Sequence, residues 1–211
     1  ANRSVSIPDS VSLRPASLTI AGWFRWLSVP TPSQSLVAKI VGSGQYNSYQ
    51  LFYDVGNRQL RGVVGTAFSF GANTTSNWTP AAGMWYHIAF TFDNSSKMGA
   101  LYVNGVQVAA QNVGAGFTIG YDNGALEIGR DNDSGTWVGF FTGQVDEVGL
   151  YNRALAAAEI AALAGVSRPQ GVQADIPAST ATLPPTGTPT STAILAPTGT
   201  PTSTAILAPT G

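Results

Sequence analysis

Apolar and polar residues alternate in short runs over the first three-quarters of the chain. The run Ser17–Trp26 reads Ser-Leu-Thr-Ile-Ala-Gly-Trp-Phe-Arg-Trp, and Trp85–Asp93 reads Trp-Tyr-His-Ile-Ala-Phe-Thr-Phe-Asp. Alternation with a period of two, rich in aromatic and β-branched side chains, is typical of strands. Gly, Asn, Asp and Pro separate the runs, as turns between strands require. The pattern predicts an all-β, antiparallel β-sandwich.

The most specific turn signal is Asn104-Gly105. It lies between the alternating segments Leu101–Val103 and Val106–Val108. A type I′ turn needs positive φ at both central residues, which Asn and Gly tolerate best. The dipeptide therefore predicts a two-residue β-hairpin.

The hydrophobic period changes once, in the segment Leu155–Ala164. Leu155, Ile160 and Leu163 fall near one face of a helix, and Gly165 follows as a stop signal. The segment predicts a single short helix after the last strand.

The composition changes near residue 168, so we expect a domain over residues 1–168 and a tail over 169–211. The tail contains two identical twelve-residue repeats, 185–196 and 197–208, and carries no charge after Asp175. Such a segment cannot bury a core of its own, and its prolines favour extended backbone. We predict an extended, low-complexity tail.

The repeats have three interpretations. As a stalk they would carry O-linked sugars, and the candidate residues are Thr186, Thr188, Thr190, Ser191, Thr192, Thr198, Thr200, Thr202, Ser203 and Thr204. As a connector, their apolar segments would add a strand to the exposed sheet edge of a neighbouring copy. Those segments are Ala193, Ile194, Leu195 and Ala196, and Ala205, Ile206, Leu207 and Ala208. In the third interpretation the same Ile and Leu side chains dock on the tail's own domain.

Four stretches in order resemble one known family. They are Val5–Leu13; Leu18–Trp26; Trp85–Asp93 followed by Leu101–Gly105; and Leu126–Arg130 followed by Phe141–Leu155 and Glu159-Ile160. Together, over residues 3 to 165, they resemble the laminin-G-like, concanavalin A-type jelly-roll superfamily with its pentraxin branch. The resemblance implies a jelly roll. One departure is that only Ala1 to Ser4 precede the first stretch, where members usually have an apolar strand.

The charge and residue inventory excludes several function classes. Only 10% of the residues are charged, the formal net charge is −1, and the chain has no Cys and one His. We therefore expect no nucleic-acid binding, disulfide or thiolate metal site. The apolar runs are too short to predict a membrane span.

The acids and the histidine do not predict an enzyme. Glycosidases of this general fold project two or three acids from alternating positions of one strand. Asp146 and Glu147 are adjacent, so a regular strand would place them on opposite faces. We interpret His87, inside an apolar strand, as structural.

The segment Asp131–Gly135, Asp-Asn-Asp-Ser-Gly, is the candidate metal site. Alternating oxygens on a glycine-bearing loop can bind a hard cation, although the same residues also form ordinary Asx turns. The resemblance to pentraxins implies calcium ligands at Asp131, Asp133 and the backbone carbonyl of Asn132, with a further ligand at Asn47. We expect one Ca²⁺ at most.

Aromatic side chains in loops are candidates for glycan binding, because sugar rings stack on flat side chains. Trp78 and Trp137 lie in Gly-, Asn- and Thr-rich segments, and Tyr46 and Tyr121 can join them. The alternative is that these rings anchor their loops to the core.

Taken together, the sequence favours a non-catalytic, extracellular module for adhesion or surface structure. In this hypothesis it is a repeated subunit of a microbial surface fibre, it pairs with copies of itself, and its tail is O-glycosylated. The alternative is a calcium-dependent carbohydrate-binding module of a larger secreted enzyme or adhesin, with glycans as partners.

Overall fold

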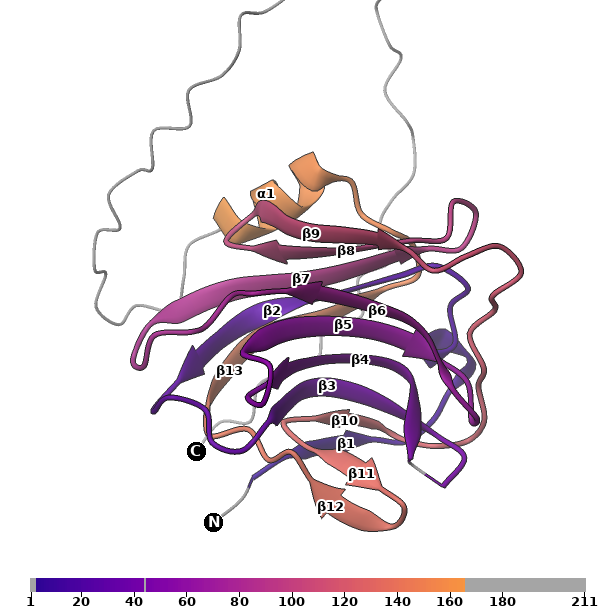
Figure 1. Cartoon of the computed structure of the whole chain (residues 1–211), viewed down its shortest axis with the longest axis horizontal. Helices are drawn as coiled ribbons and strands as arrows, with labels where there is room; N and C mark the ends of the chain where they lie inside the picture. Colours follow the sequence, from indigo (N-terminus) through magenta and orange to yellow (C-terminus); the bar gives the residue numbers. More distant parts are fainter. Residues whose placement is uncertain (1–2, 44, 166–211) are drawn as a thin grey trace, which may run out of the picture.

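The computed structural model describes residues 3–43 and 45–165, which form two antiparallel sheets packed face to face (Figure 1). The six-stranded sheet has the order β1 (Val5–Ile7), β10 (Leu126–Ile128), β3 (Gln34–Val41), β4 (Tyr46–Asp54), β5 (Gln59–Gly65) and β6 (Phe70–Ser76). The five-stranded sheet has the order β13 (Gly143–Tyr151), β2 (Leu18–Trp26), β7 (Trp85–Asp93), β8 (Met98–Val103) and β9 (Val106–Asn112). The predicted antiparallel sandwich of the jelly-roll type is confirmed.

Three smaller elements complete the described part of the chain. A 3₁₀ turn, η1 (Val11–Leu13), follows β1. The strands β11 (Asp131–Asp133) and β12 (Thr136–Val138) form a separate two-stranded hairpin, and the helix α1 (Ala157–Gly165) comes last. Figure 1 shows the hairpin at the β1–β10 end of the six-stranded sheet and the helix beside β8 and β9.

The core lies between the two sheets and follows from the alternation in the sequence. The inward residues of β2 and β7, such as Leu18, Phe24 and Phe90, are fully buried against those of β4, such as Leu51. Full burial of one such side chain contributes roughly 1.5–3 kcal/mol. Gly62 on β5 is required where the sheets meet, because a Cβ there would overlap the ring of Phe90.

The Asn104-Gly105 hairpin is confirmed. Both residues have positive φ, 49° and 81°, and their neighbours Val103 and Val106 are paired across the turn. The Asn104 side chain also accepts a hydrogen bond from the His87 backbone N–H at 3.0 Å. The turn therefore links β8 and β9 to β7.

The predicted helix is present but begins at Ala157 instead of Leu155. Glu159 accepts hydrogen bonds from the Ala156 N–H at 2.9 Å and from Arg153, which closes the first turn. Ile160 is fully buried and clusters with Leu155. Both pack against alanines of β2, β7 and β8, namely Ala21, Ala89 and Ala100. The helix thus covers part of the outer face of the five-stranded sheet.

At the start of the chain, β1 pairs with β10 and forms one edge of the six-stranded sheet. Its other side has no partner strand among residues 3–43 and 45–165. The tail 169–211, with all the predicted O-glycosylation and strand-pairing residues, lies outside the described residues. Within the described residues, no helix has the length and apolar character needed to cross a bilayer.

Candidate functional site

The segment Asp131–Gly135, expected to be a loop, lies in the hairpin β11–β12. Asp131 pairs with Val138, and Asp133 pairs with Thr136. Ser134 and Gly135 have φ values of 52° and 89°, so they form a two-residue turn of the I′ kind. The Ser-Gly dipeptide before an alternating Thr-Trp-Val was the sequence signal for this hairpin.

On one face of the hairpin, the carboxylate of Asp131 meets two amides of β4. Asn47 Nδ2 lies 3.0 and 3.2 Å from the two carboxylate oxygens, and Gln50 Nε2 lies 2.7 Å from one of them. The backbone N–H of Asn132 donates at 2.8 Å. The structure therefore brings together Asn47 and Asp131, as the pentraxin resemblance implies. Gln50 belongs to the same cluster and was not singled out from the sequence.

Burial raises the pKa of Asp131, while hydrogen bonds from Asn47, Asn132 and Gln50 oppose the increase. The negative charge of Asp133 also raises this pKa. Asp133 itself is exposed at the turn, where Ser134 Oγ donates to it at 3.1 Å. Three N–H donors therefore already hold the half-buried Asp131 carboxylate.

The Asp131 cluster offers few free oxygen atoms to a cation. Asn47 Oδ1 is buried with no hydrogen-bond partner in the structure, which leaves one acceptor oxygen beside the Asp131 carboxylate. The N–H donors of Asn47 and Gln50 would compete with a cation for Asp131. In residues 3–43 and 45–165, no group of three or more His, Cys, Asp or Glu side chains is placed to hold a metal. Few charged ligands give weak calcium binding.

On the opposite face of the hairpin, Trp137 lies over Arg130. The guanidinium carbon is 3.6 Å from the ring centroid, and the tryptophan is 43% exposed. Arg130 Nε donates to Glu127 at 2.7 Å, and Ser6 Oγ donates to the other oxygen of Glu127 at 2.6 Å. Glu127 is buried. A chain of contacts therefore fixes an exposed flat ring to the sheet through β10 and β1.

The other three aromatic candidates are held by their neighbours. Trp78 packs edge-on against Tyr86, with ring centroids 4.8 Å apart. Tyr121 donates to the Pro15 carbonyl at 2.6 Å, and Tyr46 packs on Phe70. All three rings are partly buried, an arrangement in keeping with the anchoring alternative; of the four candidates, Trp137 is the one with an exposed ring.

The comparison with protein families gives one match. The family model Laminin_G_3, described as the concanavalin A-like lectin/glucanases superfamily, matches residues 1–161. None of the curated proteins compared with the chain matches it.

Solved structures share the fold at low sequence identity. The native heptameric SAP-like pentraxin from Limulus polyphemus is 18% identical with a TM-score of 0.56, over 77% of this chain and 81% of that chain. Domain 4 of AbnA, a GH43 extracellular arabinanase from Geobacillus stearothermophilus solved with arabinotriose, is 20% identical with a TM-score of 0.56, over 76% and 72%. The NanB sialidase from Streptococcus pneumoniae is 20% identical with a TM-score of 0.59, over 77% of this chain and only 26% of the sialidase.

Proposed function

The chain belongs to the concanavalin A-like lectin/glucanases superfamily, and from that membership we propose that it is a non-catalytic module that binds carbohydrate through the hairpin β11–β12. The fold hosts many functions, so the proposal depends on the hairpin and not on the fold alone. The arabinanase domain solved with arabinotriose supports it, because that domain has the same architecture.

The exposed ring of Trp137 is the observation that carries the proposal. One face of the ring is covered by Arg130, and its exposure of 43% leaves the other side available to a ligand. The apolar C–H face of a sugar ring packs on such a surface. Because Glu127 and Ser6 already fix Arg130, binding orders few additional side chains and its entropic cost stays low.

Polar groups around the ring can orient a bound sugar. Asn132 is the cross-strand partner of Trp137 and lies on the same face of the hairpin. Its Oδ1 accepts the Gly135 N–H at 2.9 Å, so the amide N–H groups are the part of this side chain that can donate to sugar hydroxyls. A flat ring with a polar rim suits a neutral saccharide.

Calcium is a second component of the proposal. Asp131, Asp133, Asn47 and the Asn132 carbonyl would hold it on the opposite face of the hairpin. A bound cation would offset the negative charges of Asp131 and Asp133 and stiffen the turn between β11 and β12. Sugar binding at Trp137 does not require it, so the two components can be tested separately.

The test begins with a glycan array and continues with calorimetric titration of an oligosaccharide that binds. Trp137→Ala should weaken binding about tenfold or more, and Trp137→Phe should retain most of it. If calcium contributes to glycan binding, a chelator should weaken that binding, and so should the double variant Asp131→Ala with Asp133→Ala. An array with no bound glycan, or a Trp137→Ala variant with unchanged affinity, would refute the proposal.

Adhesion as a subunit of an extracellular surface fibre is the second candidate function. The observation that favours it is the outer side of β1, which has no partner strand among the described residues. An open sheet edge accepts an added strand from another chain, and the predicted segments 193–196 and 205–208 have the apolar character of one.

A further inference from the structure

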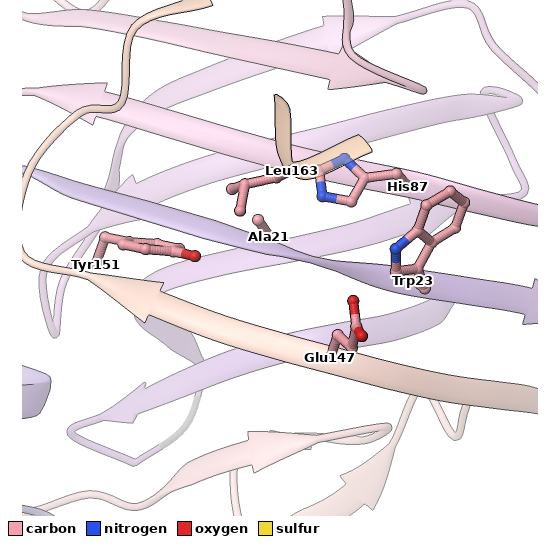
Figure 2. A pocket seen from close by; sticks show the side chains of 6 residues that line it. All are labelled: Ala21, Trp23, His87, Glu147, Tyr151 and Leu163. Atoms are coloured by element: carbon pink, nitrogen blue, oxygen red, sulfur yellow. The ribbon is translucent and has the colours of Figure 1, made fainter. Parts of the chain in front are cut away.

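A pocket of about 100 Å³ opens on the outer face of the five-stranded sheet, away from the hairpin β11–β12. Figure 2 shows its side chains, which come from β2, β7, β13 and α1: Ala21, Trp23, His87, Glu147, Tyr151 and Leu163. Ala21 and Leu163 are apolar, whereas His87, Glu147 and Tyr151 bring polar groups towards the same space. The pocket is too small for an oligosaccharide, since typical ligand pockets measure about 300–1,000 Å³.

A bulge in β13 places Glu147 at this pocket. Asp146 pairs with Trp23 and Gly149 pairs with Ala21, so Glu147 and Val148 together lie opposite Gly22. Glu147 has a left-handed backbone with φ of 50°, an unfavourable conformation for a side chain of its size. Bulges of this kind redirect a side chain and concentrate at functional sites.

Gly22 makes the bulge possible. A Cβ at position 22 would lie 3.0 Å from Val148 Cγ2, so the absence of a side chain lets Val148 pack inward. Val148 then contacts the core, and Glu147 is left on the outer face beside the pocket. The bulge at Glu147-Val148 on β13 therefore depends on the glycine at position 22 of β2.

His87 adds an unpartnered polar atom. The side chain is only 3% exposed, and its Nδ1 is buried with no hydrogen-bond partner in the structure. Burial lowers the pKa of His87 to about 4, so the imidazole is neutral at neutral pH. A neutral imidazole adds no positive charge that would repel a cation in the pocket.

Two aromatic rings complete the walls. The Trp23 ring packs edge-on against His87 with centroids 5.4 Å apart. A Cβ at Gly149 would lie 3.2 Å from the Tyr151 ring, so this glycine lets the ring lie against the strand. Burial raises the pKa of Tyr151, and the Glu147 carboxylate adds to the increase. Arg153, which lowers the pKa of Tyr151, is already paired with Glu159 at 2.7 and 2.8 Å.

We infer that this pocket binds the primary ammonium group of an alkylamine, with Glu147 as its counter-ion. Trp23 and Tyr151 provide aromatic surface for the cation. His87 forms part of the wall, and Ala21 and Leu163 contact the alkyl chain. A free amine and the lysine side chain of a partner protein share this chemistry.

His87 provides a direct measurement, because it is the only histidine in the chain. The imidazole signals are followed by NMR at neutral pH while n-butylammonium chloride is added to the full chain. We expect a saturable shift that weakens at high salt, since the Glu147 charge is near solvent. Isosteric n-butanol should produce no saturable shift.

A lysine-containing peptide that binds more tightly than n-butylammonium would identify a protein partner as the source, and equal affinity would identify a free amine.

Two variants make the inference falsifiable. Glu147→Gln removes the charge with little change of shape and should weaken n-butylammonium binding about fivefold or more. Glu147→Asn, which suits a left-handed backbone, controls for the bulge and should show the same loss with unchanged thermal stability. Trp137→Ala should leave the His87 shift intact, which separates this pocket from the hairpin site. The inference would be overturned by the absence of a saturable shift, by equal shifts with n-butanol, or by unchanged affinity in both Glu147 variants. A saturable response to a methyl glycoside in place of the amine would also overturn it.

Discussion

The guanidinium carbon of Arg130 lies 3.6 Å from the centroid of the Trp137 ring, so the two side chains form one stacked unit on the hairpin β11–β12. The stack continues inward through the buried Glu127, which holds Arg130 Nε at 2.7 Å. A planar guanidinium can stack on the ring and pair with a carboxylate at the same time, whereas an ammonium is a point charge without a flat face.

Arg130→Lys should therefore weaken glycan binding although the charge is retained. We expect a loss of about twofold to thirtyfold in affinity, since stacking of this kind contributes about 0.5–2 kcal/mol. Titration calorimetry measures the affinity, and tryptophan fluorescence reports the freed ring of Trp137. Wild-type affinity in the Arg130→Lys variant would show that the stack does not position the ring.

Much of the fold could be predicted because local sequence patterns specify it. Period-two alternation identified β2 and β7, and the Asn104-Gly105 turn fixed the register between β8 and β9. The hairpin β11–β12 was interpreted as a loop because its strands have only three residues each, so the Ser-Gly turn signal had little support from alternation on either side. Its acidic composition also favoured a metal-site interpretation.

The pocket beside α1 could not be predicted, since it depends on long-range register. Regular alternation places Asp146 and Glu147 on opposite faces, and nothing local to β13 signals the bulge opposite Gly22. The exposure of Trp137 could not be predicted from the sequence either. Trp78 lies in a similar polar segment, yet packs against Tyr86 because of how two distant strands meet.

Gly62→Ala should strongly destabilise the sandwich. The new methyl group would overlap the ring of Phe90, which is fully buried between the sheets. Neither β5 nor β7 can move away without opening the core, so we expect a loss of about 3 kcal/mol or more in unfolding free energy. Urea denaturation measures the change. Gly56→Ala is the matched control, because its Cβ would meet nothing closer than 3.4 Å, and it should be nearly neutral.

The stability of the domain should fall as the pH is lowered from about 6.5 to 4, through His87. Burial lowers the pKa of His87 in the folded state to about 4, below the ordinary value of 6.5 expected on unfolding. The unfolded chain therefore binds a proton first, and protonation favours unfolding in this window. The loss should reach about 2–3 kcal/mol near pH 4 and increase no further below it from this residue.

Unfolding free energies at several pH values, compared between wild type and His87→Gln, check this expectation. The difference between the two proteins should change only between pH 6.5 and 4. An NMR titration of the imidazole should give a midpoint near 4 in the folded protein. A midpoint close to the ordinary histidine value would contradict the burial that the structure assigns to this side chain.

Removal of residues 177–211 should abolish any polymer of this chain if the repeats add a strand to the open edge at β1. For one copy, burial of an Ile and a Leu contributes roughly 3–6 kcal/mol, and four or five backbone hydrogen bonds add about 0.5–1.5 kcal/mol each. Ordering five residues costs about 1–2 kcal/mol each, so a single copy is close to balance. Two copies on one tail raise the effective concentration and favour association.

The matched control for that deletion keeps the length and the Thr and Ser content of the tail. Ile194→Asp with Ile206→Asp replaces one large apolar side chain in each repeat with a charge, which disfavours burial of the segment, and should prevent polymers as the deletion does. Electron microscopy and sedimentation velocity of full-length chain and both variants report the assembly state. Polymers that persist in the deletion variant would exclude the tail as the connector. Polymers lost on deletion but kept in the Asp variant would point to the attached sugars or the tail's length instead of strand addition.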